Sequence, residues 1–364
     1  MDLMRPELVA DAGAPPAHGA ADGRRTVVSV LSRQGPRSLC TDDVARLRRA
    51  ADVRFHALDG APDRTTAAAL LRGTGILAAT NACLPVLDAV LLDALPALRA
   101  VVLYATGYGH IDVDLLAARG IGLSVLPAYA TGAVAEHAIA MVLSLATRLH
   151  LAHDRSRGLV HDGTSLRGVE LAGRTLGVLG VGRIGTRVAR LGGALGMRVV
   201  GSDTDTVAVV RARAAGIAMA DLPALLAASD VLVVCASQAF RAPALLGAAE
   251  LRRMRPGALL VNVSRAALVD TAAATVAVRA GRLRGYAVDD VVLDPRADGD
   301  LLVEGRVLQS GHSAWWRDEV LERGRRMWAR NLLAAIAGMP LDPVVWPPRA
   351  TRGAPHRPDL AAST

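Results

Sequence analysis

The stretch GRTLGVLGVGRIGTRVARLGGALGMRVVGSDTD, residues 173–205, decides the fold. Its apolar run Thr175–Leu179 predicts a buried strand, and a glycine-rich turn joins that run to a helical pattern. In this turn Gly180 permits a tight bend, Gly182 removes a side chain where a pyrophosphate must approach the backbone, and Gly185 lets the helix pack closely on the strand. Strand, turn and helix together predict the dinucleotide-binding turn of a Rossmann domain.

The next strand of this unit indicates which dinucleotide binds. It ends in Asp203, 18 residues after Gly185, where a carboxylate can bind the ribose hydroxyls of NAD and would repel the 2′-phosphate of NADP. The helix begins with Arg183 and Ile184, whose free N–H groups and helix dipole are expected to face the phosphates. We therefore predict NAD as the cofactor. The alternative is a glycine-rich turn that holds no ligand.

The bulk composition fits a globular protein of two domains. The chain has 364 residues, of which 52% are hydrophobic. Its net charge of +8 would by itself suggest nucleic acid, but all 42 basic residues are scattered arginines and only 3% of residues are aromatic. We therefore expect no nucleic-acid partner. The three cysteines, Cys40, Cys83 and Cys235, show no metal-ligand spacing, so we predict no metal site and free thiols in a reducing cytoplasm.

Three segments bear on location and on the ends of the chain. No basic-then-apolar signal pattern opens the sequence. The long apolar stretch Ala133–Leu149 is interrupted by Glu136, His137 and Arg148 and is short for a membrane span, so we expect no membrane partner. This stretch is interpreted as a helix buried between domains, or as one that also packs on a second subunit. Residues 1–23 and 346–364 are expected to be disordered tails.

Short apolar runs alternate with helical patterns through the rest of the chain, which predicts two doubly wound parallel α/β domains. Thr41 and Thr131 are expected to act as N-caps of two helices. The runs are nearly continuous, as in sheets covered by helices on both faces. The predicted strands are Thr26–Leu31, Val53–Leu58, Gly75–Ala79, Ala100–Tyr104 and Gly122–Leu126, then Thr175–Leu179, Arg198–Gly201, Ile217–Ala220, Val231–Ala236, Leu259–Val263, Gly285–Val288 and Val307–Gln309.

Five stretches occur in the order of one known family. They are LRAVVLYATGYGHIDVDLLAARGIGLSVLPAYATGAVAEHAIAMVLSL (98–145), LAGRTLGVLGVGRIG (171–185), MRPGALLVNVSRAALVD (254–270), GYAVDDVVLDP (285–295) and GHSAWWRDE (311–319). With these motifs the chain resembles the D-isomer-specific 2-hydroxyacid dehydrogenases over most of residues 75–340. It is nearest to the branch that reduces hydroxypyruvate or glyoxylate.

The resemblance implies that a Rossmann cofactor domain, residues 127–312, is inserted into a flavodoxin-like substrate domain. The substrate domain would be discontinuous, comprising residues 24–126 and 313–345, with crossings near Leu126 and Ser313. The resemblance also implies a cleft between the domains and, usually, a homodimer. Further cofactor contacts are implied for four residues outside the glycine turn. These are Thr131, Ala236, Val263 and Asp289, the last beside the nicotinamide carboxamide, with a strand-end cap as its alternative role.

Reduction of a 2-keto acid to a 2-hydroxy acid needs a cation for the carboxylate, a proton donor for the carbonyl oxygen and a hydride donor. The family motifs assign the first role to Arg265, whose planar fork matches a carboxylate and which follows a predicted strand. They assign the second role to His312, because histidine titrates near neutral pH. Asp294 would hydrogen-bond the other ring nitrogen and favour the imidazolium.

The substrate side resembles the family less completely. The backbone of Thr106, Gly107, Tyr108 and Gly109 is similar to the loop that receives the substrate carboxylate through N–H groups. Asn81 matches a substrate-side Thr-Asn-Lys of the hydroxypyruvate branch, but Ala82 replaces its lysine. Trp315 is interpreted as a pocket wall or, alternatively, as a core or interface aromatic.

Other departures lie close to the expected chemistry. Asp294 stands where the family usually has Glu, Gly311 replaces the proline before the histidine, and Ala266 replaces the glycine after Arg265. The family's His-Cys-Pro-Leu-Thr segment reads CASQA from Cys235. This drift suggests either a specialised substrate or relaxed activity.

Two functions of different class follow from these residues. The first is an NAD-dependent oxidoreductase that reduces a small 2-keto acid to a D-2-hydroxy acid. The second is an NAD-sensing binding protein with little turnover, since the C-terminal-binding corepressors share the fold and a motif similar to His312–Trp316. Within the family, formate oxidation is disfavoured because no Gln-Pro-Gln-like segment replaces Leu293–Pro295. Phosphite oxidation is disfavoured because the chain has no lysine.

Overall fold

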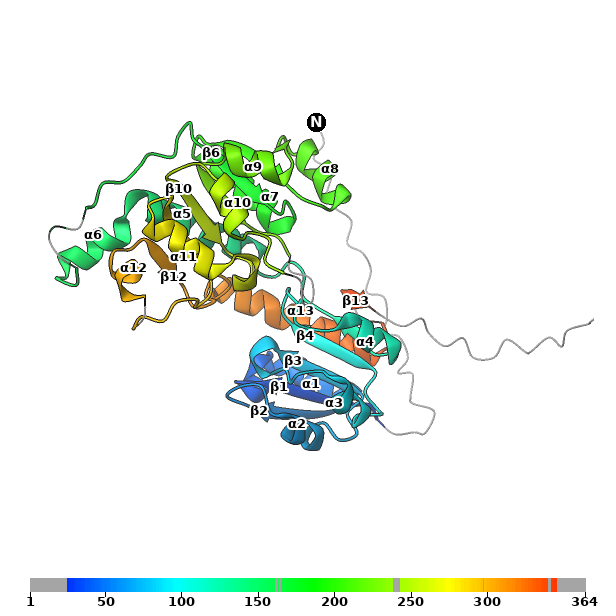
Figure 1. Cartoon of the computed structure of the whole chain (residues 1–364). Coiled ribbons are helices and arrows are strands. Elements are labelled where there is room, and N and C mark those ends of the chain that lie inside the picture. Colours follow the sequence, from blue (N-terminus) through cyan, green and yellow to red (C-terminus); the bar gives the residue numbers. More distant parts are fainter. Residues whose placement is uncertain are drawn as a thin grey trace, which may run out of the picture. The chain divides into compact units, whose positions relative to one another are not determined.

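A computed structural model describes residues 25–160, 163, 165–237, 243–296, 298–339 and 342–345 (Figure 1). The predicted tails, 1–23 and 346–364, lie outside the described residues. The chain divides into two compact units, each described here by itself. The first unit comprises Met1–Tyr104, Val113–Val125 and Arg325–Thr364, and the second comprises Ala105–Asp112 and Leu126–Gly324.

The first unit holds a six-stranded sheet in the order β13-β5-β4-β3-β1-β2. The order β2-β1-β3-β4-β5 is that of a flavodoxin-like sheet, and these strands pair in parallel. The strands are β1 (Val27–Ser32), β2 (Asp52–Ala57), β3 (Ile76–Thr80), β4 (Ala100–Tyr104), β5 (Gly122–Ser124) and β13 (Pro343–Val345). Its α-helices are α1 (Thr41–Ala50), α2 (Arg64–Leu70), α3 (Ala89–Asp93), α4 (Val113–Ala118) and the larger part of α13 (Asp318–Ile336). Short 3-10 turns are η1 (Gly35–Ser38) and η2 (Asn81–Cys83).

The end of the chain completes the first unit. Trp328 of α13 is fully buried, donates its indole N–H to the carbonyl of Val102 at 3.0 Å, and packs edge-on against Tyr104. Asn331 donates to Ser124 and to the carbonyl of Val125. The last strand, β13, pairs antiparallel with β5 and was not among the predicted strands. Its short run of three residues carries no repeating pattern from which to predict it.

The second unit holds a seven-stranded parallel sheet in the order β12-β11-β10-β9-β6-β7-β8. The strands are β6 (Thr175–Leu179), β7 (Arg198–Ser202), β8 (Ala218–Met219), β9 (Val231–Val234), β10 (Ala258–Asn262), β11 (Leu283–Val288) and β12 (Val307–Gln309). The strand order reverses between β6 and β9, which is where ligands bind in doubly wound sheets. The predicted fold class, two doubly wound α/β domains, is therefore confirmed.

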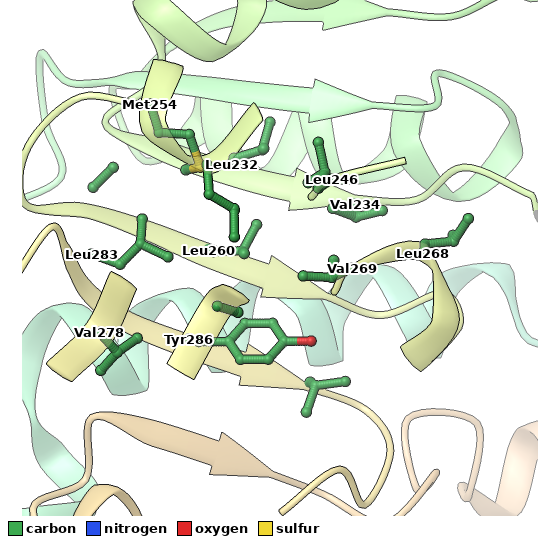
Figure 2. Packing of buried hydrophobic residues seen from close by; sticks show 14 of the residues in the cluster. Leu232, Val234, Leu246, Met254, Leu260, Leu268, Val269, Val278, Leu283 and Tyr286 are labelled. Atoms are coloured by element: carbon green, nitrogen blue, oxygen red, sulfur yellow. The ribbon is translucent and has the colours of Figure 1, made fainter. Parts of the chain in front are cut away.

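Helices cover both faces of this second sheet. They are α5 (Thr131–Thr147), α6 (Leu149–Ser156), α7 (Arg183–Ala194), α8 (Thr206–Ala214), α9 (Leu222–Ala228), α10 (Ala248–Arg253), α11 (Thr271–Arg279) and α12 (Gly299–Val303), with the 3-10 turn η3 (Ala266–Leu268). Figure 2 shows one face, where Leu232, Leu260 and Tyr286 of the strands pack with Val278 of α11 and Met254 after α10. On the other face a Cβ at Gly285 would lie 3.0 Å from Leu145 of α5. The central strands are buried throughout, as their continuous apolar runs predict.

Two predicted helix caps are wrong by one residue. Thr41 and Thr131 are the first residues of α1 and α5, and the N-cap positions are taken by Cys40 and Ala130 without a side-chain hydrogen bond. The predicted long helix Ala133–Leu149 also differs, because Arg148 adopts a left-handed backbone with φ of 57° and separates α5 from α6. No single described helix is long and apolar enough to cross a membrane, although α5 and α6 pass that test as a pair bent by 65°.

The boundaries between the units differ from the predicted crossings. The division after Val125 lies one residue from the predicted crossing near Leu126. The segment Ala105–Asp112, however, belongs to the second unit. The later division falls after Gly324 rather than near Ser313, because Ser313 is hydrogen-bonded to Asp289 of the second unit.

Candidate active site

The glycine turn has the geometry that its sequence predicts. Gly180 has φ of 90°, which only glycine adopts readily, and a Cβ there would lie 2.5 Å from the backbone of Ala236. A Cβ at Gly185 would lie 1.9 Å from the carbonyl oxygen of Gly180. At Gly182, by contrast, a Cβ would meet nothing within 4 Å. The two outer glycines therefore serve close packing within the protein, and the middle one leaves space beside the backbone.

Asp203 is fixed directly beside this turn. Its carboxylate accepts hydrogen bonds from the N–H of Val181 at 2.8 Å and from the N–H of Asp205 at 3.0 Å. Gly182 is the N-cap of α7 and offers no side chain to the N–H groups of Arg183 and Ile184. Open space, an uncapped helix N-terminus and a fixed carboxylate fit the pyrophosphate and ribose of a dinucleotide.

Two further predicted cofactor residues, Ala236 and Val263, follow strands at the same edge of the sheet. Ala236 follows β9, lies against Gly180, and accepts a hydrogen bond from the hydroxyl of Ser264. Val263 follows β10 and is hydrogen-bonded to β9 through Val234. Thr131 opens α5. Burial raises the pKa of the Cys235 thiol to about 12, so this residue beside the turn stays protonated.

Arg265 lies against the predicted substrate loop. It follows the buried strand β10, and its Nη1 donates to the carbonyl of Ser264 at 2.9 Å. A Cβ at Gly107 would lie 2.0 Å from Nη2 of Arg265, so the guanidinium occupies the space that any larger residue would fill. Burial, and then the charge of Arg265, lower the pKa of nearby His110. The structure thus brings Arg265 together with the loop that contains Gly107.

The other residues of that loop are held in place or exposed. The hydroxyl of Thr106 donates to the carbonyl of Leu126 at 2.7 Å, and Tyr108 is 37% exposed. Asn81 lies in the first unit, exposed, directly after β3. The structure does not bring Asn81 together with Arg265 within one unit, so its substrate role stays a prediction.

His312 is exposed on the loop that follows β12, and its backbone is left-handed with φ of 60°. Trp315 and Trp316 follow in an edge-on pair, with ring centroids 5.0 Å apart. Because β10, β11 and β12 are parallel neighbours, Arg265, Asp289 and His312 all follow carboxyl ends at one edge of the sheet.

The predicted hydrogen bond from Asp294 to His312 is not formed between these described residues. Asp294 is exposed and instead accepts the N–H of Arg296 at 2.9 Å, while its carbonyl accepts the N–H of Asp298. A short aspartate side chain reaches its own turn readily, and this contact is an Asx-type turn. The structure therefore gives Asp294 a local structural contact in place of the predicted one.

Asp289 is buried, 6% exposed, and fastens the His312 loop. Its carboxylate accepts the hydroxyl of Ser310 at 2.7 Å and the N–H groups of Ser313 at 2.8 Å and Ala314 at 3.1 Å. These contacts correspond to the alternative capping role considered for Asp289, extended to a distant loop. His137 of α5 joins the same cluster, 3.0 Å from the hydroxyl of Ser310.

Sequence reasoning missed His137, Ser310 and His110 as functional candidates. A signal existed for His137, since it and Glu136 interrupt a largely apolar helical run that is mostly buried in the structure. Ser310 gave no signal by itself, because a serine before a glycine is an ordinary turn residue. Among the described residues, no group of three or more His, Cys, Asp or Glu is placed to hold a metal ion.

Comparison with known proteins identifies the family. Residues 139–314 match the family model "D-isomer specific 2-hydroxyacid dehydrogenase, NAD binding domain". The chain is 32% identical over 300 residues to D-3-phosphoglycerate dehydrogenase of Mycobacterium leprae, covering 82% of this chain and 56% of that one. It is 34% identical over 261 residues to glyoxylate reductase of Aeropyrum pernix, covering 69% of this chain and 77% of the relative.

A solved structure agrees with these sequence relatives. D-lactate dehydrogenase from Aquifex aeolicus, complexed with NAD and lactic acid, matches with a TM-score of 0.69 and 25% identity, over 85% of this chain and 96% of that one. The chain spans about half the length of the phosphoglycerate dehydrogenases that it matches. The chain belongs to the D-isomer-specific 2-hydroxyacid dehydrogenase family, and the cofactor of its second unit is a nicotinamide dinucleotide.

Proposed function

We propose that this protein is an NAD-dependent oxidoreductase that reduces a small 2-keto acid to a D-2-hydroxy acid, and catalyses the reverse reaction. The observation that carries the proposal is the position of the Arg265 guanidinium directly against the backbone of Gly107. A fork of N–H donors beside a glycine backbone suits a carboxylate, which needs several donors in a small space. Relatives named as reductases and dehydrogenases support an enzyme over an NAD-sensing binding protein.

Each residue has a distinct part in the proposed reduction. Arg265 and the N–H groups of the Thr106–Tyr108 loop bind the substrate carboxylate, and Arg265 also polarises the ketone. His312 donates a proton to the carbonyl oxygen during reduction and removes it during oxidation. The hydride for C2 comes from the reduced dinucleotide when it is bound. Asp203 favours NAD, because its carboxylate would repel a 2′-phosphate.

The substrate, the individual substrate contacts, the oligomeric state and the location are proposed from the relatives and from the resemblance. Similarity to glyoxylate reductase supports a small, compact substrate, and we place glyoxylate and hydroxypyruvate before larger keto acids. Asn81 and Trp315 remain proposed contacts of the substrate, supported by their position in the motifs. Asp294 is not proposed as a partner of His312, because its carboxylate accepts the N–H of Arg296. The homodimer and the cytoplasmic location are likewise proposals from the resemblance, with Cys40, Cys83 and Cys235 free as a reducing compartment would require.

NADH oxidation with a panel of glyoxylate, hydroxypyruvate, pyruvate and 2-ketobutyrate tests the proposal. We expect turnover with at least one member, and we expect Gly107→Ala to raise KM and lower kcat because the new methyl displaces the Arg265 guanidinium. Gly193→Ala, at an open position of α7 outside this loop, is the control. Absence of turnover with every member of the panel, together with intact NADH binding, would contradict the proposal and favour a binding protein.

A further inference from the structure

The loop that carries His312 has an unusual backbone. Gly311 and His312 both adopt left-handed conformations, with φ of 62° and 60°. Proline is locked near φ of −65°, so the proline that the family usually places before this histidine cannot occupy position 311 in this loop. Histidine seldom adopts this conformation unless the surrounding structure holds it there. Something other than a proline must therefore fix the direction of the His312 side chain.

Asp289 holds the backbone on both sides of Gly311 and His312, the left-handed pair. Before the pair it accepts the hydroxyl of Ser310, and after the pair it accepts the N–H groups of Ser313 and Ala314. A buried carboxylate that accepts three hydrogen bonds is a strong anchor, because the acceptor is charged and screened from water. The two ends of the left-handed pair are therefore tied to one side chain at the end of β11.

His137 extends this anchor to helix α5. Its Nε2 lies 3.0 Å from Oγ of Ser310, and its Nδ1 lies 3.3 Å from Nη2 of Arg317. Arginine only donates, so Nδ1 accepts, and Nε2 must carry the ring hydrogen of a neutral imidazole. Nε2–H then donates to Ser310, whose own hydroxyl hydrogen goes to the carboxylate of Asp289. In this series of hydrogen bonds, only one placement of the hydrogen atoms gives every donor an acceptor.

The surroundings of His137 favour that neutral form. Its side chain is 15% exposed, and the charged groups recorded against it are Asp289 at the end of β11, 3.9 Å away, and Arg317 in the segment after β12. Burial is the largest influence and lowers the pKa of His137; the Asp289 charge opposes it and the Arg317 charge reinforces it. Arg317 also donates to the carbonyls of Ser313 and Trp316. The segment 310–317 is therefore bonded to His137 of α5 at both of its ends, through Ser310 and through Arg317.

We propose that His137 is a positioning residue for His312: it fixes the left-handed loop through Ser310, Asp289 and Arg317. This inference rests on the proposed function of His312 as the proton donor. His137 touches none of the reacting atoms in this role. It acts by holding the His312 ring in one direction, so its loss reduces the fraction of molecules in which the ring is aligned.

The main test replaces Ser310 by Ala and by Thr, and His137 by Phe. Ser310→Ala and His137→Phe remove the hydrogen bond, and we expect kcat to fall about 10- to 100-fold, as for a slightly misplaced catalytic group. We expect KM and the Kd of NADH to stay within about twofold, since Arg265 and the glycine turn are untouched. Ser310→Thr retains the hydroxyl and should recover most of the turnover.

Ser144→Ala is the matched control. It removes a bond of the same kind from the same helix, between Ser144 and His150 at 3.0 Å, seven residues further along α5 than His137. We expect Ser144→Ala to keep the turnover of the unaltered protein. Equal turnover in Ser310→Ala, His137→Phe and Ser144→Ala would overturn the proposal, and so would a rise in KM without a fall in kcat.

Amide hydrogen exchange tests the inference apart from catalysis. The N–H groups of Ser313 and Ala314 are bonded to Asp289, so they should exchange faster in Ser310→Ala and His137→Phe than in Ser144→Ala. Unchanged exchange overturns the proposal, whatever the turnover. If the unaltered protein reduces no keto acid, the proposed function fails while exchange still decides whether His137 holds the loop. Should His137→Phe not fold, Ser310→Ala gives the same comparison.

Discussion

The glycine turn and the His312 loop are both held in one backbone conformation, but in different ways. The turn from Gly180 to Gly185 is contiguous, and its shape depends on these two glycines, which leave no room for a methyl group. The His312 loop is held by Asp289 and His137 from two distant segments, and by Arg317 from the same segment. Adding one methyl group should therefore disrupt the glycine turn. Removing one hydrogen bond from the His312 loop should only loosen its conformation.

Removing the proposed proton donor should give the largest effect on turnover. His312→Ala should lower kcat by about 100- to 10,000-fold, the range for loss of a general acid. The Kd of NADH should stay near its original value, because the glycine turn is untouched. Steady-state kinetics and NADH fluorescence measure the two quantities. Unchanged turnover would remove His312 from proton transfer.

A methyl group at the tightest point of the glycine turn should destabilise the protein. In Gly185→Ala the added Cβ would lie 1.9 Å from the carbonyl oxygen of Gly180, so we expect a loss of about 1–3 kcal/mol in the free energy of unfolding. Gly193→Ala is the control, because that position of α7 is open and alanine favours a helix. Denaturant unfolding should rank Gly193→Ala above the unaltered protein and Gly185→Ala below it. The reverse order would show that the turn tolerates a side chain.

Gly182→Ala separates packing from ligand binding. A Cβ there meets nothing within 4 Å in the protein, so the free energy of unfolding should change by less than about 1 kcal/mol. The methyl group would lie where the pyrophosphate is expected, so the Kd of NADH should rise by about tenfold or more. Thermal unfolding and NADH titration give the two values. An unchanged Kd would mean that the dinucleotide approaches elsewhere.

The carboxylate beside the turn should set cofactor choice. Asp203→Ala removes the repulsion of a 2′-phosphate, and the preference for NAD over NADP should fall by roughly tenfold, the value of one hydrogen bond to a charged group. The ratio of kcat/KM for the two cofactors is the measurement, because it cancels any common loss of stability from the freed Val181 N–H. A constant ratio would assign the preference to other residues.

The smallest effect should appear in the pH dependence of stability. Burial lowers the folded-state pKa values of His56, His110, His137 and His150 from 6.5. The unfolded chain then takes up protons first, so this stability is present above pH 6.5 and is lost as pH falls through the lowered values. The melting temperature should therefore drop between pH 7 and pH 5, and less so in His137→Gln. A flat or rising melting temperature in that window would contradict these directions.

The sequence predicted the fold where one segment alone determines a structure. The turn Gly180–Gly185 and the strands Ala100–Tyr104, Thr175–Leu179 and Val307–Gln309 were predicted with their observed bounds, since apolar runs and glycines act locally. The break at Arg148 and the strand Pro343–Val345 were missed because tertiary contacts decide them.

The candidate site divides in the same way. Motifs located Arg265, Asp289 and His312, which follow neighbouring strands of one sheet. They did not reveal that Asp289 fastens the loop, that Asp294 turns back on its own backbone, or that His137 approaches from α5. The bonds of Asp289 and His137 join residues more than 20 positions apart and have no signature in a single sequence. The contact of Asp294 is local, but it competes with the bond to His312 that the motif implies, and only the coordinates show which of the two forms.

The manner in which Asp289 holds its loop also decides which substitutions the loop can accept. Two of its three bonds go to backbone N–H groups, which every residue but proline possesses. The bond at position 313 therefore does not depend on the side chain there, and an apolar residue would donate its backbone N–H as serine does. Substitutions at position 313 that keep the backbone N–H can therefore change the surface of the loop without removing this bond to Asp289.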